Sequence, residues 1–152
     1  IGAAPYIVPY IPSEIDSGPS FDTFFTVAGL FALWAQVPAM AAAIEAQDQS
    51  EWKGITVGAM MRRLIDGNEE AMDRRFVVLL ASRGSRFERY VRQSFLLLRG
   101  ARGFVPLDFD RLYWDVRTWD TEQGDTVRMQ WARDFYKRNT TDSSNQEKGA
   151  RQ

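Results

Sequence analysis

Arginines are concentrated in the middle of the chain, where their spacing suits contacts with phosphate groups. On a helix over residues 85–100, Arg89, Arg92 and Arg99 fall within roughly 80° of one another, opposite the apolar side. Glu88 is the only acid on this helix. A surface that serves solubility mixes both signs of charge, whereas a phosphate-binding surface does not. The pattern favours phosphate binding, with a solvated helix face as the plainer alternative.

Two arginines on the preceding helix extend this candidate surface. Arg74 and Arg75 lie near the first half of a helix that opens at about residue 68. They either continue the arginine stripe or pair with acids of their own helix, and the sequence leaves both readings open.

A second arginine pair lies near the end of the chain. Arg128 and Arg133 are five residues apart, so they project from different parts of one helix surface. Across the preceding turn, Asp115 or Asp120 is a candidate ion-pair partner for Arg133. The candidate nucleic-acid-binding residues are Arg74, Arg75, Arg89, Arg92, Arg99, Arg128 and Arg133.

The sequence has few residues of the types that commonly act in catalysis. The chain has no His and no Cys, which removes the commonest general base, the thiolate nucleophile and the usual transition-metal ligands. Asp108 and Asp115 can share a helix face, as a Mg²⁺ nuclease would need, but Asp110 and Asp120 do not join them. Glycine-rich phosphate loops are absent from the sequence. We therefore predict no catalytic residue, no metal ligand and no cofactor.

Composition indicates one globular domain. The chain has 152 residues, 45% of them hydrophobic and 26% charged, which is ordinary for a protein with a single core. Its net charge of −1 argues against a free-standing, high-affinity nucleic-acid binder but allows a local basic stripe. Most of the 19 basic residues are arginines, whose planar guanidinium suits bidentate hydrogen bonds to phosphates and ion pairs at protein interfaces. The lack of Cys mildly favours a cytoplasmic location.

Two amphipathic helices are predicted over residues 106–120 and 126–137. Their apolar residues recur every three or four positions, and Asp108 is the expected N-cap of the first. The short turn between them predicts antiparallel neighbours with facing aromatic sides. We expect Trp114, Trp119 and Trp131 to lie in the core rather than to form a base-stacking platform.

The first predicted helix carries no charge between Asp22 and Glu45. That run is about long enough to span a bilayer. However, Gln36 and Pro38 interrupt it, and no Lys or Arg cluster flanks it, so we expect a buried core helix instead. Further helices are predicted over 56–65, capped by Thr56, and from about residue 84 to residue 100.

The two ends differ from this helical body. Prolines in residues 1–19 predict an extended strap over the body, and the polar residues 139–152 predict a disordered tail. The expected fold is all-α: a compact bundle of about six helices, in one or two lobes, forming one domain over residues 1–138.

Several short sequence motifs together resemble those of the small subunit (CasB) family of the type I-E CRISPR Cascade complex. The densest lie near the C-terminus: Leu107-Asp108-Phe109, Arg111-Leu112, Asp115, Trp119-Asp120, Val127-Arg128 and Trp131-Ala132-Arg133-Asp134-Phe135-Tyr136. Earlier ones are Phe25-Thr26-Val27-Ala28-Gly29-Leu30-Phe31-Ala32-Leu33 and Arg74-Arg75-Phe76 with Leu79-Leu80. The resemblance covers roughly residues 5–136 and also implies further helix upstream of residue 1.

This resemblance implies a non-catalytic subunit of a crRNA-guided complex in antiviral defence. Subunits of this family lie as a pair along the complex, against the CasC backbone subunits and the large subunit CasA. They help to hold the guide RNA–target DNA hybrid and the displaced non-target strand, and no membrane is involved. The alternatives are a helical scaffold or adaptor without nucleic-acid contact and, less supported by the residues, a carboxylate-metal nuclease.

Overall fold

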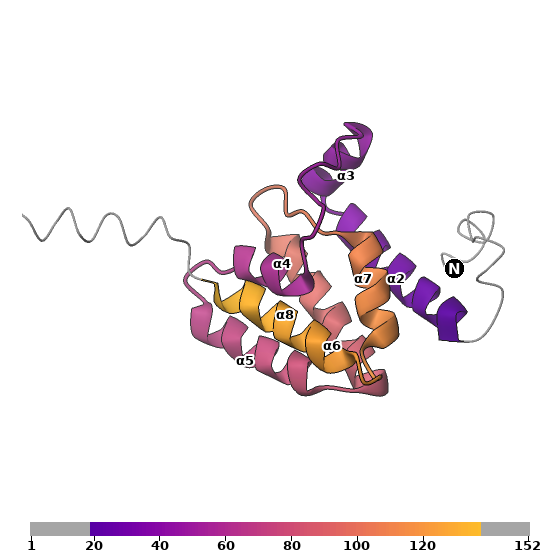
Figure 1. Cartoon of the computed structure of the whole chain (residues 1–152). Coiled ribbons are helices and arrows are strands. Elements are labelled where there is room, and N and C mark those ends of the chain that lie inside the picture. Colours follow the sequence, from indigo (N-terminus) through magenta and orange to yellow (C-terminus); the bar gives the residue numbers. More distant parts are fainter. Residues whose placement is uncertain (1–18, 138–152) are drawn as a thin grey trace, which may run out of the picture.

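The computed structural model describes residues 19–137, and within them every regular element is helical (Figure 1). This confirms the all-α fold. The elements are α2 (Pro19–Ala35), α3 (Pro38–Glu45), α4 (Val57–Arg63), α5 (Glu69–Ala81), α6 (Gly84–Leu96), the 3-10 helix η2 (Leu97–Gly100), α7 (Phe109–Thr118) and α8 (Gly124–Tyr136). The predicted strap before Pro19 and the predicted tail from residue 139 lie outside the described residues.

Helix α2 is a core element. Trp34 is fully buried, and its indole Nε1 donates a hydrogen bond to the carbonyl of Val105 at 2.8 Å. Phe31 meets Phe109 of α7 edge to face, with ring centroids 5.0 Å apart. No single helix within residues 19–137 is long and apolar enough to cross a membrane; α2 and α3 pass that test only as a pair bent by 104°.

Two predicted N-caps fix the starts of α4 and α7. The Thr56 hydroxyl accepts a hydrogen bond from the backbone N–H of Ala59 at 3.3 Å. The Asp108 carboxylate accepts one from the N–H of Arg111 at 2.9 Å and another from the N–H of Gly54 at 2.7 Å. Asp108 therefore both caps α7 and ties it to the loop before α4.

Helix α8 packs closely on α4 and α5. Gly58 of α4 lies directly against the backbone of Trp131, where a Cβ atom on residue 58 would stand 2.7 Å from the Trp131 carbonyl carbon. On the α5 side, the rings of Phe76 and Phe135 stack with centroids 4.1 Å apart. A small residue on α4 and a stacked pair of rings, one from α5 and one from α8, thus form these two contacts of α8.

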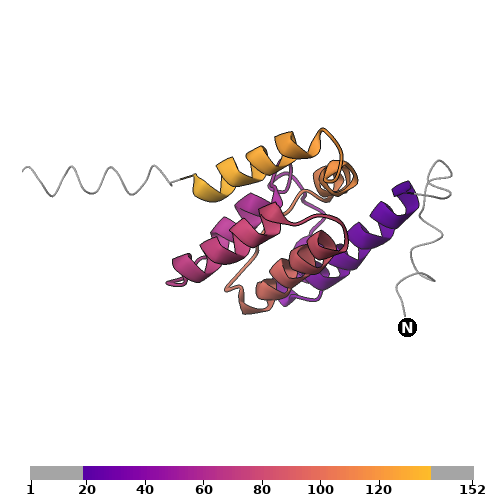
Figure 2. The same ribbon diagram turned by 90° about the horizontal axis from the view of Figure 1, so that it is seen from below.

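Helices α7 and α8 meet at a steep angle. Helix α8 runs across both views, whereas α7 is seen nearly end-on in Figure 2. The prediction of an antiparallel pair is wrong, because α8 aligns with α4 and α5 rather than with α7. Trp119 and Trp131 are buried as predicted, but Trp114 is 57% exposed and is not a core residue. It lies on the outer side of α7, four residues from Thr118, whose hydroxyl donates to its carbonyl.

Candidate nucleic-acid interface

Helix α6 has one buried side and one arginine side, as its sequence predicts. Phe87, Val91 and Phe95 point into the core and are almost fully buried. The helix begins at Gly84, whose φ of +54° is the left-handed conformation that glycine tolerates best. Its backbone N–H donates to both carboxylate oxygens of Asp120, each at 3.2 Å. The start of α6 is therefore held by a carboxylate that follows α7.

Trp119 fixes α6 from the core side. Its indole Nε1 donates to the carbonyl of Ser82 in the turn before α6, at 2.9 Å. Its ring stacks on Phe87 with centroids 4.2 Å apart and planes inclined by 18°. The buried aromatic pair leaves α6 little freedom to rotate, so the outward direction of its arginines is set by the core.

The arginine stripe is exposed along its length. Arg89, Arg92 and Arg99 all face solvent, and none of them forms an ion pair within residues 19–137. The Arg89 guanidinium lies 5.3 Å from the centroid of the Tyr90 ring, within cation–π range. An unpaired guanidinium keeps its planar fork of N–H donors available for a phosphate.

The two arginines of α5 face the same helix across a groove. Arg74 pairs with Glu70 at 3.0 Å on the surface, where such a bridge contributes little stability, and Arg75 forms no ion pair with any described residue. Both line a groove of about 640 Å³ together with Tyr90 and Gln93 of α6. The structure thus places Arg74 and Arg75 beside the arginine helix.

Arg128 has a structural role. Its side chain is only 14% exposed, and its guanidinium donates to the Trp119 carbonyl at 2.7 Å and to the Asp125 carboxylate at 2.6 Å. The guanidinium also lies 5.2 Å from the centroid of the Trp119 ring. The pKa of the Asp125 carboxyl is lowered by its hydrogen bond to this arginine. Arg128 therefore holds the α7–α8 turn, and we do not include it in the interface.

Arg133 is exposed on α8, away from the α6 stripe. In Figure 2, α8 lies along one side of the molecule, and α6 with α2 lies on the other. Neither proposed partner pairs with Arg133: Asp115 contacts Arg111 and Trp131, and Asp120 accepts from Gly84. The expected ion pair across the turn is wrong, because both carboxylates already serve the turns and the core.

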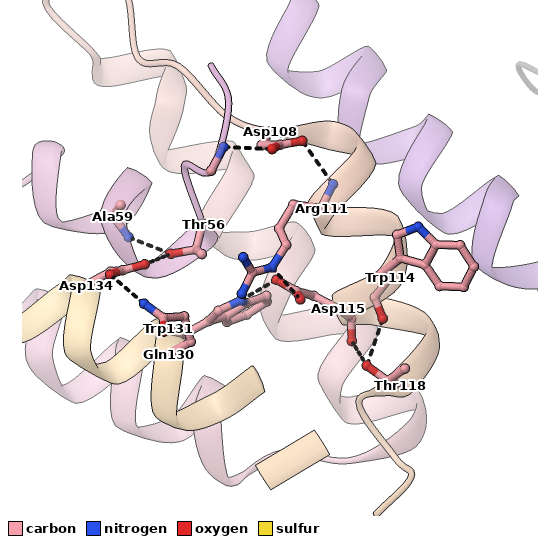
Figure 3. A network of polar contacts seen from close by, with 11 residues as sticks. Thr56, Ala59, Asp108, Arg111, Trp114, Asp115, Thr118, Gln130, Trp131 and Asp134 are labelled. Atoms are coloured by element: carbon pink, nitrogen blue, oxygen red, sulfur yellow. Dashed lines mark hydrogen bonds and ion pairs between the residues drawn. The ribbon is translucent and has the colours of Figure 1, made fainter. Parts of the chain in front are cut away.

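Asp108 and Asp115, two of the carboxylates weighed as a nuclease site, belong with Asp134 to a network of hydrogen bonds between helices (Figure 3). Asp115 is only 3% exposed; it accepts from the Trp131 indole at 2.8 Å and from the Arg111 guanidinium at 3.2 Å. Asp134 accepts from the Thr56 hydroxyl at 2.6 Å and from the Gln130 amide at 3.0 Å. No group of three metal-binding side chains of suitable type gathers in the part of the chain that the structure describes.

Burial dominates the electrostatics of Asp115. Desolvation raises the pKa of its carboxyl above the ordinary value, although the hydrogen bond from Trp131 and the charge of Arg111 act in the opposite direction. A carboxylate in this position joins α7 to α8 through the Trp131 indole. These contacts give Asp115 a structural role among the aromatic residues of the core, and no catalytic role is needed to explain its position.

The groove between α5 and α6 was not predicted from the sequence. Tyr90 follows the periodic spacing of the apolar side of α6, yet it is only half-buried and lines the groove. The available signal was on α5, where Val77 and Val78 lie outside the apolar positions that pack inward. β-Branched residues gain nothing from an exposed helix position, so such a pair marks a surface with another use.

Together these features define a class of protein: a small helical protein whose buried polar side chains are hydrogen-bonded and which carries a stripe of exposed arginines, Arg89, Arg92 and Arg99, without ion pairs to the described residues. The model of the CRISPR-associated protein Cse2 family matches residues 1–136, and the chain belongs to this family. Cse2 corresponds to CasB, the small subunit of type I-E Cascade, so the chain is a subunit of a CRISPR Cascade complex. Comparisons with curated proteins and with solved structures found no match.

Proposed function

We propose that this subunit stabilises the guide RNA–target DNA hybrid and the displaced strand through the arginines of α6 and of η2, which follows it, without catalysing a reaction itself. The observation that carries the proposal is the one-sided set of Arg89, Arg92 and Arg99, exposed and unpaired on a chain of net charge −1. Such a local stripe supplies phosphate contacts, which position a nucleic acid but do not read its sequence.

Near-zero net charge fits a subunit that works inside an assembly. A free chain of this kind attracts nucleic acid weakly, because its long-range electrostatic potential is small. Neighbouring subunits that orient the stripe along a strand remove that limitation. The partners in this proposal are the CasC backbone, the large subunit CasA, a second copy of this chain, the crRNA and both DNA strands, in the cytoplasm.

The test changes the stripe inside the assembled complex. Replacing Arg89, Arg92 and Arg99 together by Gln leaves the buried side of α6 intact, so we expect normal folding and assembly. If each arginine contacts one phosphate, target DNA affinity falls about 100-fold at ~0.15 M salt, and by a similar factor for different target sequences. The readout is the dissociation constant of target DNA for the purified complex.

A matched variant controls for the loss of three charges. Lys53, Arg63 and Lys137 are exposed basic residues outside α5 and α6 that form no ion pair with a described residue, and their joint replacement by Gln changes net charge equally. We expect this control to bind target DNA nearly as well as the wild type. Equal losses in both variants, or no loss in either, would contradict the proposed role of α6.

A scaffold or adaptor role is the second candidate, and exposed apolar side chains favour it. Trp114 of α7 and Met129 of α8 are each more than half exposed, and Arg117 lies over the Trp114 ring at 5.4 Å. Such residues are typical of protein interfaces. If Trp114→Ala prevents assembly while the arginine variant assembles and binds target normally, the adaptor function alone accounts for the chain.

A further inference from the structure

Two adjoining hollows lie along the α5–α6 hairpin and together form the groove. The 640 Å³ cavity described above is lined near one end by Arg74 and Arg75, and its floor includes Leu96 and Leu97. A second hollow of about 540 Å³ continues toward the turn, where Arg83 and Arg86 line it. Both hollows are lined by Val78 and Tyr90, so they adjoin one another at these two residues.

The floor of this groove is apolar and open to solvent. Val78 lines both hollows and is 44% exposed. Tyr90 of α6 is half-buried and also lines both hollows. A groove of several hundred Å³ with such a floor has the size and character of a site for flat, weakly polar groups.

The charged side chains that line the groove within residues 19–137 are all arginines. Arg74 is paired with Glu70, which does not itself line the groove, whereas Arg75 and Arg86 form no ion pair with a described residue. An occupant must therefore combine repeated negative charges with flat apolar faces. A single nucleic-acid strand has this chemistry, because its phosphates alternate with bases that stack on aromatic rings.

The arginines beyond the groove favour a strand over a protein helix. Arg92 of α6 and Arg99 of η2 line neither hollow, and Arg89 lies next to Tyr90 in α6. A docked acidic helix would need charges only along the groove rims. An extended polyanion that leaves the groove accounts for the further unpaired arginines.

We infer that the α5–α6 groove binds unpaired bases of single-stranded DNA, with Tyr90 as the stacking residue and the flanking arginines on the phosphates. The inference rests on the proposed function, in which the displaced DNA strand is the strand left without a pairing partner. It adds a contact that the arginine stripe alone does not supply, because stacking acts on bases and the stripe acts on phosphates.

The test compares two oligomers with equal charge and different bases. The full chain is titrated at low salt with fluorescent 12-mers of oligo(dT) and of abasic deoxyribose phosphate, and binding is read by anisotropy. We expect oligo(dT) to bind about tenfold more tightly, the effect of roughly one stacked base. Tyr90→Leu keeps an apolar side chain and should abolish this difference. Val78→Glu, at an exposed position, should weaken oligo(dT) binding further by repulsion.

Control variants separate this inference from the proposed function. Trp114→Leu removes an exposed aromatic ring on α7 and should leave the tenfold preference intact. Equal binding of both oligomers, with affinity still dependent on Arg89, Arg92 and Arg99, would refute the groove inference and leave the proposed function standing. Loss of dependence on those arginines would refute both. Failure of Tyr90→Leu to assemble with Cascade subunits, with oligomer binding unchanged, would assign the groove to a protein partner.

Discussion

The contact between α4 and α8 depends on the absence of a side chain at residue 58. A Cβ atom there would stand 2.7 Å from the carbonyl carbon and 2.9 Å from the Cα of Trp131. Gly58→Ala therefore places a methyl group against backbone, which cannot rotate away as a side chain can. The substitution should push α4 away from α8 and loosen the packing around the fully buried Met60 and Trp131.

The expected loss follows from overpacking. Forcing extra carbon into a well-packed contact destabilises a protein by about 1–3 kcal/mol. At roughly 4 °C per kcal/mol for a chain of this size, the melting temperature should fall by about 4–12 °C. The change is confined to packing, because residue 58 lies in a helix where alanine is otherwise the better helix former.

Gly29→Ala is the matched control. Gly29 lies within α2, and a Cβ atom there meets no atom within 4 Å. Its helix propensity should raise stability by up to about 1 kcal/mol. Thermal unfolding of both variants, followed by circular dichroism, tests the reasoning. A Gly58→Ala protein as stable as the wild type would show that α4 and α8 are not held at this distance.

Two further predictions concern the buried network around Asp115. Trp131→Ala should destabilise the chain by about 3–5 kcal/mol, whereas Trp131→Phe should lose only the indole donor, about 1–3 kcal/mol; denaturant unfolding distinguishes the two. Asp115→Asn retains an acceptor oxygen and should stay within about 1 kcal/mol of the wild type at neutral pH, unlike Asp115→Ala. Because burial raises the pKa of folded Asp115 above 3.8, the wild type should lose stability relative to Asp115→Asn as pH rises from that value through the folded pKa. Melting curves at several pH values measure this, and an opposite trend would show that Arg111 outweighs burial.

Local signals predicted much of the fold. Thr56 and Asp108 are short polar residues directly before apolar-periodic segments, and both cap helices as expected. The periodicity around Phe87 and Val91 identified the buried side of α6, and hence the side on which the arginines lie. These features depend on residues close in sequence, which is why the sequence alone was sufficient for them.

Features that depend on distant contacts were harder to predict. Trp114 shares the aromatic character of Trp119, but only packing by α2 and α8 decides which side of α7 is covered. Arg128 looks like a surface cation, yet the carbonyl of Trp119 and the carboxylate of Asp125 engage it after the chain turns. The groove beside Tyr90 arises from how α5 lies on α6, a relation that no single helix pattern encodes.

The salt dependence of target binding tests the central claim most directly, because its slope counts phosphate contacts. The logarithm of the association constant should fall with the logarithm of salt concentration by about 0.9 for each duplex phosphate neutralised. With Arg89, Arg92 and Arg99 replaced by Gln in the assembled complex, we predict a slope shallower by about 2–3. The control at Lys53, Arg63 and Lys137 should keep the wild-type slope. An unchanged slope in the α6 variant would show that these arginines do not contact nucleic acid.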